Sequence, residues 1–238
     1  MAYLKWISDQ DLIDVTKNLL NKAVEIKKKA EKNMNKNVID PFSSLFQIGG
    51  FEVGYDEWLN GEITRQAQKS LQNHVGDFHQ NVLGSVKGWE NQKTGKIIDL
   101  VCAERQIIAE VKNKHNTVKK SDLGGVYDTL ADAVSTKVSM YKGYTAYYVT
   151  VIPPKSEKFN KPFTPSDNKK GQRKEAQETV REIDGASFYE LVTGDPNALR
   201  DLFAALPTVI SDITGKQFED KEIASLLSLF NGAYGEQV

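Results

Sequence analysis

Apolar residues recur at spacings of three and four along three segments, and this period predicts three amphipathic helices. The first helix is expected over residues 11–33 and the second over residues 62–83. The third begins at a cap formed by Ser121 or Asp122 and runs to about Tyr141. Serine and aspartate are preferred at that position because their side chains accept hydrogen bonds from the free N–H groups of the first turn.

Three shorter segments are rich in β-branched and aromatic residues, which predicts strands. Residues 96–103 and 106–112 are separated by only two residues, so we expect them to form an antiparallel hairpin. The third strand is expected over residues 145–152, where Pro153 ends it. The order helix, hairpin, helix, strand predicts an α/β fold with a mixed central sheet flanked by helices.

The other segments lack a clear period. Residues 37–60 contain Pro41 and several glycines, so a loop with short turns is expected there. Residues 155–174 are expected to form a polar, lysine-rich loop, and the chain from Glu175 onward is expected to be mostly helical. We expect one domain, 1–238, made of an N-terminal helical and loop extension (1–60), a core (61–154), and a basic loop with a helical C-terminal part (155–238).

Composition places the chain among soluble globular proteins. It has 238 residues, of which 39% are hydrophobic and 26% charged. No segment approaches the roughly 20 apolar residues needed to span a bilayer, so no membrane association is expected. The first residues lack the apolar centre of a signal peptide, and Cys102 is the only cysteine. Both observations favour a cytoplasmic location.

Charge is distributed unevenly, although the net charge is only −1. Residues 111–120 contain four lysines and no acid, and residues 153–174 contain seven bases and two acids. Binding to a phosphate backbone requires a local cationic surface rather than a cationic average. These two segments are therefore candidates for nucleic-acid contacts, although lysine runs also occur simply as solvated faces.

Three residues carry the candidate chemistry: Asp99, Glu110 and Lys112. Asp99 lies on the first strand of the expected hairpin and the other two lie on the second. Because the strand repeat is two residues, Glu110 and Lys112 point to the same face together with Ile108. Two carboxylates suit Mg²⁺, and a lysine beside them can orient water and stabilise negative charge. Such a group can hydrolyse a phosphodiester.

Spacing alone does not establish this site, because acid-x-Lys triplets arise by chance about once or twice in a chain of this length and charge. The others here are Glu25-Ile-Lys27, Asp167-Asn-Lys169 and Glu219-Asp-Lys221. None of them lies in an apolar strand or follows a strand aspartate. A purely structural interpretation makes Asp99 a turn residue and Glu110 and Lys112 a surface pair. The apolar neighbours of Glu110 favour function instead, because carboxylates are rarely buried without a partner.

Asp99 followed by Glu110-Val111-Lys112 resembles the PD-(D/E)xK nuclease superfamily, with Ile98 at the position that is often proline. A closer similarity links residues 75–84, 109–117 and 181–194 to type II restriction endonucleases that cut GGNCC-type sites. The second of these segments reads Ala-Glu-Val-Lys-Asn-Lys-His-Asn-Thr. The similarity extends over roughly residues 70–205.

This resemblance implies a restriction-endonuclease-like core and a type II site-specific deoxyribonuclease. Asp99 and Glu110 would bind Mg²⁺, and Lys112 would assist the attacking water. The implied DNA-binding residues follow the catalytic strand or lie in the basic loop: Asn113, Lys114, Asn116, Thr117, Lys169, Lys170 and Arg173. A homodimer would cut duplex DNA at a short, G/C-rich, near-palindromic site, and a cognate DNA methyltransferase is implied in the genome.

Two alternatives stay open at this stage: a repair or recombination nuclease of the same superfamily, and a catalytically silent DNA-binding protein. Other chemistries are disfavoured. His74, His79 and His115 lack zinc-ligand spacing, and His79 is expected to be structural. No glycine-rich phosphate-binding motif is present in the sequence, which argues against nucleotide-driven activity.

Overall fold

A computed structural model describes residues 2–33, 38–92, 98–167 and 171–235. Its helices are α1 (Asp9–Asn33), α2 (Pro41–Gly50), α3 (Tyr55–Gly84), α4 (Leu123–Ser135), α5 (Gly185–Thr193), α6 (Ala198–Thr214) and α7 (Asp220–Tyr234). Its strands are β1 (Glu90–Asn91), β2 (Leu100–Cys102), β3 (Ile107–Lys114), β4 (Thr145–Ile152), β5 (Asn160–Pro162), β6 (Ser166–Asp167), β7 (Gln172–Arg173) and β8 (Val180–Asp184).

Six strands form a mixed sheet in the order β1-β2-β3-β4-β8-β5, and β6 and β7 form a separate pair. The strands β1, β2 and β3 are antiparallel, which confirms the expected hairpin. The strands β3, β4 and β8 are parallel, and β5 runs antiparallel to β8. A parallel neighbour requires a crossover connection, which α4 supplies between β3 and β4. The predicted α/β fold with a mixed sheet is therefore confirmed.

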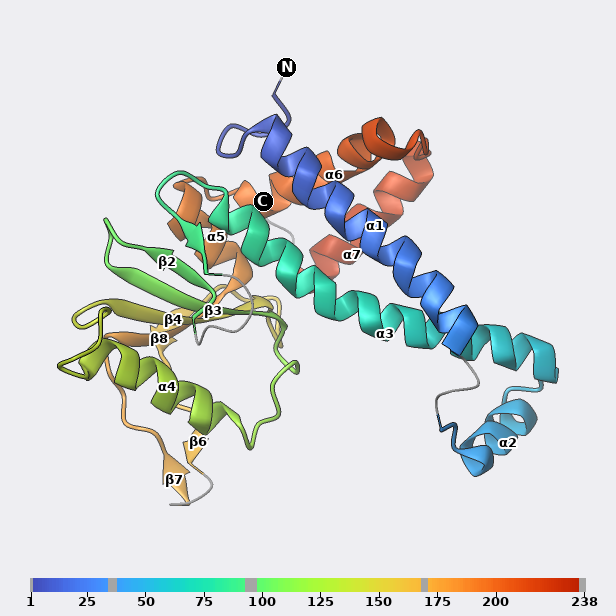
Figure 1. Cartoon of the computed structure of the whole chain (residues 1–238), viewed down its shortest axis with the longest axis horizontal. Helices are drawn as coiled ribbons and strands as arrows, with labels where there is room; N and C mark the ends of the chain where they lie inside the picture. The colour runs from blue at the N-terminus through green and yellow to red at the C-terminus, as the bar shows by residue number, and fades with distance from the viewer. Residues whose placement is uncertain (1, 34–37, 93–97, 168–170, 236–238) are drawn as a thin grey trace.

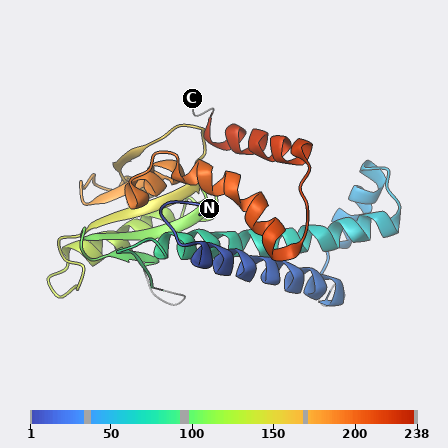
Figure 2. The ribbon, with the colours of Figure 1, turned by 90° about the horizontal axis from the view of Figure 1, so that it is seen from above.

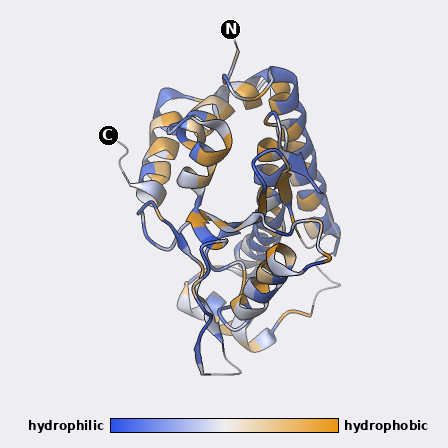
Figure 3. Ribbon diagram, turned by 90° about the vertical axis from the view of Figure 1, so that its left-hand side faces the viewer, coloured by the Kyte–Doolittle hydropathy of each residue, from blue (hydrophilic) through white to orange (hydrophobic). Residues whose placement is uncertain are grey.

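Helices cover both faces of the sheet, as Figure 1 shows. On β3, Ile107, Ala109 and Val111 belong to the larger core, which also contains residues of α1, α3, α5, α6 and α7. Ile108 belongs to a second core, beneath α4. The alternation expected from the sequence is thus confirmed, and it places Glu110 and Lys112 on the α4 side of the strand. Figure 3 shows hydrophobic and hydrophilic positions mixed along each helix, as amphipathic helices require.

The helix α3 extends well beyond the sheet. It has 30 residues, which corresponds to about 45 Å at 1.5 Å per residue. Its C-terminal part packs against β3, and α1 lies along it. Figures 1 and 2 both show α2 at the outer end of α3, far from the sheet. None of the described helices is long and apolar enough to cross a membrane.

The prediction of a loop over residues 37–60 is wrong for most of that segment, because α2 and the beginning of α3 lie there. Asp40 caps α2 by accepting hydrogen bonds from the N–H groups of Phe42 and Ser43, and Pro41 occupies the first turn. Proline is well tolerated there because that turn has no intrahelical partner for its N–H. Gly49 and Gly50 are the last two residues of α2, and Gly54 is the N-cap of α3.

The expectation of a mostly helical region after Glu175 is confirmed by α5, α6 and α7, but β8 also lies there, as an interior strand of the sheet that was not expected. The five residues of β8 are too few to show a period against the long helices that follow. The third helix ends at Ser135 rather than near Tyr141, since Thr136 leaves the helical conformation. Short strands β5, β6 and β7 also interrupt the loop expected over residues 155–174.

Candidate active site

The hairpin of β2 and β3 brings Asp99 and Glu110 together. The register pairs Leu100 with Ala109 and Val101 with Ile108. Continuing it by one residue places Asp99 opposite Glu110, and the N–H of Asp99 donates to the carbonyl of Ala109 at 3.0 Å. Directly opposed residues project to the same face of a sheet, so the carboxyl groups of Asp99 and Glu110 are neighbours, and the charge of Asp99 raises the pKa of Glu110. Both predicted metal ligands therefore belong to one group of side chains.

Asp99 is held in place by the backbone of the neighbouring strand. One of its carboxylate oxygens, Oδ2, accepts a hydrogen bond from the N–H of Val111 at 2.7 Å. The β2–β3 ladder ends at the pair Leu100 and Ala109, so Val111 lies beyond it. The N–H of Val111 therefore finds its partner in the Asp99 side chain rather than in a carbonyl of β2. A buried N–H requires such a partner. The local structure thus ties the Asp99 side chain to the backbone of Val111, the residue between Glu110 and Lys112.

Burial sets the electrostatics of the two carboxyl groups. Desolvation is the main cause that raises the pKa of both Asp99 and Glu110. The charge of Asp99 raises the pKa of Glu110 further, whereas Lys112 lowers both. The charge of Asp77, on α3, also raises the pKa of Asp99. Two carboxylates that repel one another in a desolvated place favour the binding of a cation between them.

Lys112 completes the group. Its Nζ lies 2.5 Å from Oε1 of Glu110, and the side chains of Lys112 and Glu110 are 23% and 17% exposed, respectively. A half-buried ion pair of this kind keeps the ammonium group beside the carboxylates rather than free in solvent. The structure therefore brings Asp99, Glu110 and Lys112 together as the sequence predicted. Their roles in catalysis stay a prediction.

A cleft of about 410 Å³ adjoins Lys112. One wall is the polar face of α3 and the other is the end of β3 with the residues that follow it. The lining residues are Lys69, Gln72, Asn73, Gly76, Asp77, Gln80, Val111, Lys112, Asn113, Lys114, Asn116 and Thr117. Gln80 joins the two walls, because its amide Nε2 donates to the carbonyl of Val111 at 3.4 Å.

The residues predicted to bind DNA fall into three groups. Lys114, Asn116 and Thr117 line the cleft, and Oγ1 of Thr117 accepts from the N–H of Lys114 at 3.2 Å. Asn113 also contributes to the lining, but its side chain is buried, and its Oδ1 has no hydrogen-bond partner among the described residues.

The remaining predicted residues belong to the basic loop. Arg173 lies on β7, outside the cleft lining, and donates to the carbonyl of Thr164 at 3.3 Å. Lys169 and Lys170 lie outside the described residues.

The contribution of α3 to the cleft was missed by sequence reasoning, which used only the apolar stripe of that helix. Lys69 and Asp77 lie on the opposite, polar stripe together with Gln72, Asn73 and Gln80. These positions recur at intervals of three and four, so the pattern was present in the sequence. It could not be assigned a function before α3 was known to pack against β3.

His79 has a structural role, as predicted. Its ring packs edge-on against Phe78 and Tyr189, and Nδ1 is 2.8 Å from the hydroxyl of Tyr189. Burial lowers the pKa of His79 to about 4. Among the described residues there is no group of three or more His, Cys, Asp or Glu side chains that could hold a metal ion. Mg²⁺ commonly takes only one or two carboxylates, with water and phosphate completing its shell.

The topology of the sheet, with the acidic and lysine side chains on neighbouring strands beside a cleft, defines a restriction-endonuclease-like protein. Comparison with known proteins identifies the family. The family model of the Eco47II restriction endonuclease matches residues 4–215. The chain is 48% identical over 240 residues to the type II restriction enzyme Eco47II of Escherichia coli, covering 99% of this chain and 100% of that protein.

A second relative is more distant. The type II restriction enzyme Sau96I of Staphylococcus aureus is 30% identical over 217 residues, covering 88% of this chain and 80% of that protein. The chain belongs to the Eco47II restriction endonuclease family, and it is a type II restriction endonuclease. This result confirms the resemblance to restriction enzymes and decides against the repair nuclease and the silent DNA-binding protein.

Proposed function

We propose that this enzyme uses Mg²⁺ and the group Asp99, Glu110 and Lys112 to hydrolyse both strands of duplex DNA at a short, G/C-rich, near-palindromic site of the GGNCC type. One observation carries the proposal: Asp99 and Glu110 lie opposite each other on paired strands, and the ammonium group of Lys112, 2.5 Å from Glu110, lines a cleft that also contains Lys69 and Lys114. The family supplies the reaction class, and the similarity noted in the sequence supplies the type of site.

The donor set fits Mg²⁺. This ion prefers carboxylate oxygens and retains several waters, which two neighbouring carboxylates allow. The raised pKa values of Asp99 and Glu110 indicate that their ionised forms lack a compensating cation beyond Lys112. Asp99 and Glu110 would hold the ion. When bound, it would neutralise phosphate charge and lower the pKa of coordinated water.

Lys112 would act on the water and the developing charge. Its ammonium group is held by Glu110 at the edge of the cleft, within reach of a phosphate that enters there. In that position it can hold the attacking water by a hydrogen bond and stabilise negative charge as it forms. Asp99, fixed by the N–H of Val111, would keep the two carboxylates in register.

Both walls of the cleft would contact DNA. Lys69, Lys112 and Lys114 supply positive charge for the phosphate backbone. Asn116 and Thr117 offer hydrogen-bonding groups at the cleft rim that suit phosphates or base edges. Arg173 and the neighbouring lysines of the basic loop are proposed as a second contact. Arginine and lysine pair well with guanine, as a G/C-rich site requires.

We also propose that two copies act together in the cytoplasm. A near-palindromic site has two-fold symmetry, and a homodimer with one catalytic group per subunit matches it, each subunit cutting one strand. A cognate DNA methyltransferase would protect the host sites.

A plasmid digest tests the proposal. With Mg²⁺, discrete fragments are expected, and sequencing of their ends should yield one recurrent GGNCC-type site. A chelator should stop the reaction. Random degradation, or no cleavage by folded protein in the presence of Mg²⁺, would count against the proposal. Lys17→Ala, an exposed lysine on α1 outside the cleft lining, is a suitable control that should cut normally.

A further inference from the structure

The helix α2 and its flanks form an exposed apolar surface at the outer end of α3. No residue of α2 is buried. Six large apolar side chains between Val38 and Tyr55 are 61–102% exposed. We call them the arm-tip surface: Val38, Phe42, Leu45, Phe46, Phe51 and Tyr55. Single exposed apolar residues are ordinary, but Phe42, Leu45 and Phe46 share one face of α2 by their spacing, and an exposed apolar group of this size marks an interaction site.

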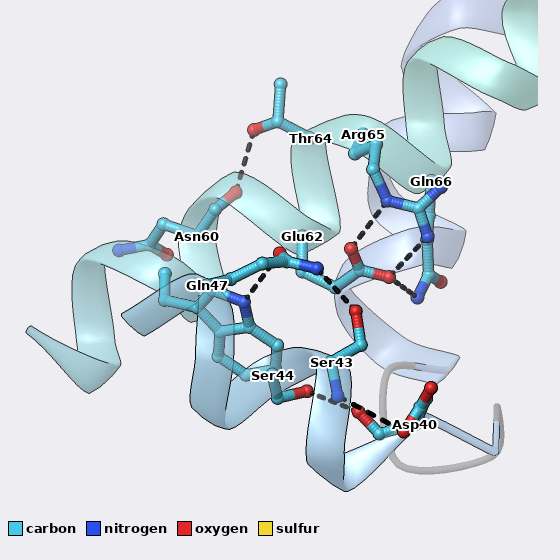
Figure 4. A network of polar contacts seen from close by, with 10 residues as sticks. Asp40, Ser43, Ser44, Gln47, Asn60, Glu62, Thr64, Arg65 and Gln66 are labelled. Carbon is cyan, nitrogen blue, oxygen red and sulfur yellow. Dashed lines mark hydrogen bonds and ion pairs between the residues drawn. The ribbon is translucent and has the colours of Figure 1, made fainter. Parts of the chain in front are cut away.

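Polar contacts, rather than burial, hold α2 in place. Asp40 caps its first turn, with Oδ1 accepting from the N–H groups of Phe42 at 3.0 Å and Ser43 at 3.2 Å. The indole Nε1 of Trp58 donates to Oε1 of Gln47 at 3.1 Å, which attaches α2 to α3. Figure 4 shows this network between the two helices. The apolar face of α2 is therefore presented in a fixed geometry, which reduces the entropy lost on association.

The charge of this region argues against DNA as the occupant. Residues 38–65 contain five acids and one base, Arg65, which is paired with Glu62, and α2 itself carries no charged side chain. Affinity for DNA depends mainly on cations that contact phosphates. A region of net negative charge would be repelled by the phosphate backbone of DNA. The apolar centre with an acidic margin instead suits a protein surface that is apolar in the middle and basic at its edge.

The same chain presents such a basic edge. The last two turns of α1 carry the exposed lysines Lys27, Lys28, Lys29 and Lys32. Figure 1 shows that α1 ends at the same outer end of the molecule where α2 lies. A two-fold axis through the arm tip would place the uncharged faces of two α2 helices against each other. The acids that flank α2 in one copy would then meet the α1 lysines of the other copy.

We infer that the arm-tip surface is covered by a second copy of this chain and forms a dimer contact. A fully buried aromatic side chain covers roughly 150–250 Å², so the six side chains expose on the order of 800 Å² per copy. That is about the area each partner contributes to an interface of standard size. The inference rests on the proposed function for the expectation that two copies act on one site, and it names the surface that joins them.

The test compares two double variants by sedimentation equilibrium of the full chain without DNA. Phe42→Ser with Phe46→Ser removes the centre of the arm-tip surface. Val138→Ser with Met140→Ser is the control, because these residues are 93% and 80% exposed but lie after α4. The wild type and the control are expected to be dimeric, and the arm-tip variant should show a dimer dissociation constant at least 100-fold higher. All three should have the same circular dichroism spectrum, which shows that the arm-tip variant is folded.

A second variant tests the charge complementarity. Lys28→Glu with Lys29→Glu should also weaken the dimer, and the effect should shrink as salt concentration rises, because exposed charges are screened. A monomeric wild type, or an arm-tip variant that stays as dimeric as the control, would overturn the inference. Loss of DNA binding by the arm-tip variant with the dimer retained would instead assign the surface to DNA.

Failure of the proposed function would be recognised separately. The arm-tip variant keeps the catalytic group, so it should still nick DNA in the presence of Mg²⁺ while double-strand cleavage falls at least tenfold. A wild type that dimerises but does not cut would contradict the proposed function and leave the dimer contact standing. A wild type that cuts while both variants stay dimeric would contradict only the contact.

Discussion

Oδ2 of Asp99 accepts a hydrogen bond from the backbone N–H of Val111, the residue between Glu110 and Lys112, over 2.7 Å. This bond ties the three functional side chains to one short piece of hairpin. Asp99 therefore stabilises the hairpin in addition to its proposed role in catalysis. Substitutions at this position should therefore be chosen so that the hydrogen-bond acceptor is retained.

Asp99→Asn should abolish cleavage while leaving the hairpin intact. The asparagine carbonyl can still accept from Val111, but the negative charge proposed to hold Mg²⁺ is gone. We expect the rate of plasmid cleavage to fall by a factor on the order of 1,000 or more, as for the loss of a central electrostatic group. Binding of duplex DNA, measured by gel shift with Ca²⁺ or without metal, should change only a few-fold. Full activity in this variant would contradict the site assignment.

The same substitution should make the metal-free protein more stable at neutral pH. Burial raises the folded-state pKa of Asp99 and Glu110 above the ordinary carboxyl value of about 4. The unfolded chain therefore loses these protons first, and wild-type stability falls as pH rises from about 4 through the raised values. Removing one of the two charges should raise the melting temperature by about 2–4 °C for each kcal/mol gained in the free energy of unfolding.

Thermal unfolding with a chelator present, at a series of pH values, measures this effect. The melting temperature of Asp99→Asn should exceed that of the wild type only slightly near pH 4, and the difference should grow towards neutral pH. If the two melting temperatures are equal at every pH, or if their difference shrinks as pH rises, the two carboxylates do not repel one another.

Lys112→Ala should also reduce cleavage to a small residual rate, but through a different electrostatic change. Lys112 lowers the pKa of Glu110, to which it is paired at 2.5 Å. Without it, the pKa of Glu110 should rise further, so residual activity should require higher pH than in the wild type. The pH profile of single-turnover cleavage checks this shift. Lys17→Ala should retain both the wild-type rate and the wild-type profile.

Lys69→Ala should weaken DNA binding without changing the chemistry. Lys69 lies on the α3 wall of the cleft and is exposed. If it contacts a phosphate, its loss should lower the slope of log affinity against log salt by about 1, roughly independently of sequence. The cleavage rate at saturating DNA should stay within a few-fold of the wild type. An unchanged salt slope would remove Lys69 from the proposed interface.

Gly185→Ala should destabilise the fold. An added Cβ at Gly185, the first residue of α5, would lie 2.3 Å from the carbonyl oxygen of Val151 on β4. Relief requires movement of a buried strand, so we expect a loss of about 1–3 kcal/mol in the free energy of unfolding. Gly125→Ala in α4 is the matched control, because nothing lies within 4 Å of its added Cβ. That control should gain up to about 1 kcal/mol from higher helix propensity.

Sequence periodicity alone determined the parts of this protein that depend on local geometry. The strand repeat placed Glu110 and Lys112 on one face, and the helical repeat located most of α1, α3 and α4. These predictions were confirmed because side-chain direction follows directly from the backbone repeat. The sequence also contained the hairpin that carries Asp99, since only a few residues separate β2 from β3.

Tertiary structure decided which distant segments meet. Pairing register places Asp99 opposite Glu110, and packing of α3 on β3 brings Lys69 to the cleft. The same long-range contacts insert β8 beside β4, where a helical region was expected. They also leave α2 without a covering layer, although its composition resembles that of a buried helix. A local pattern specifies which face is apolar, but only the arrangement of the whole chain determines what that face meets.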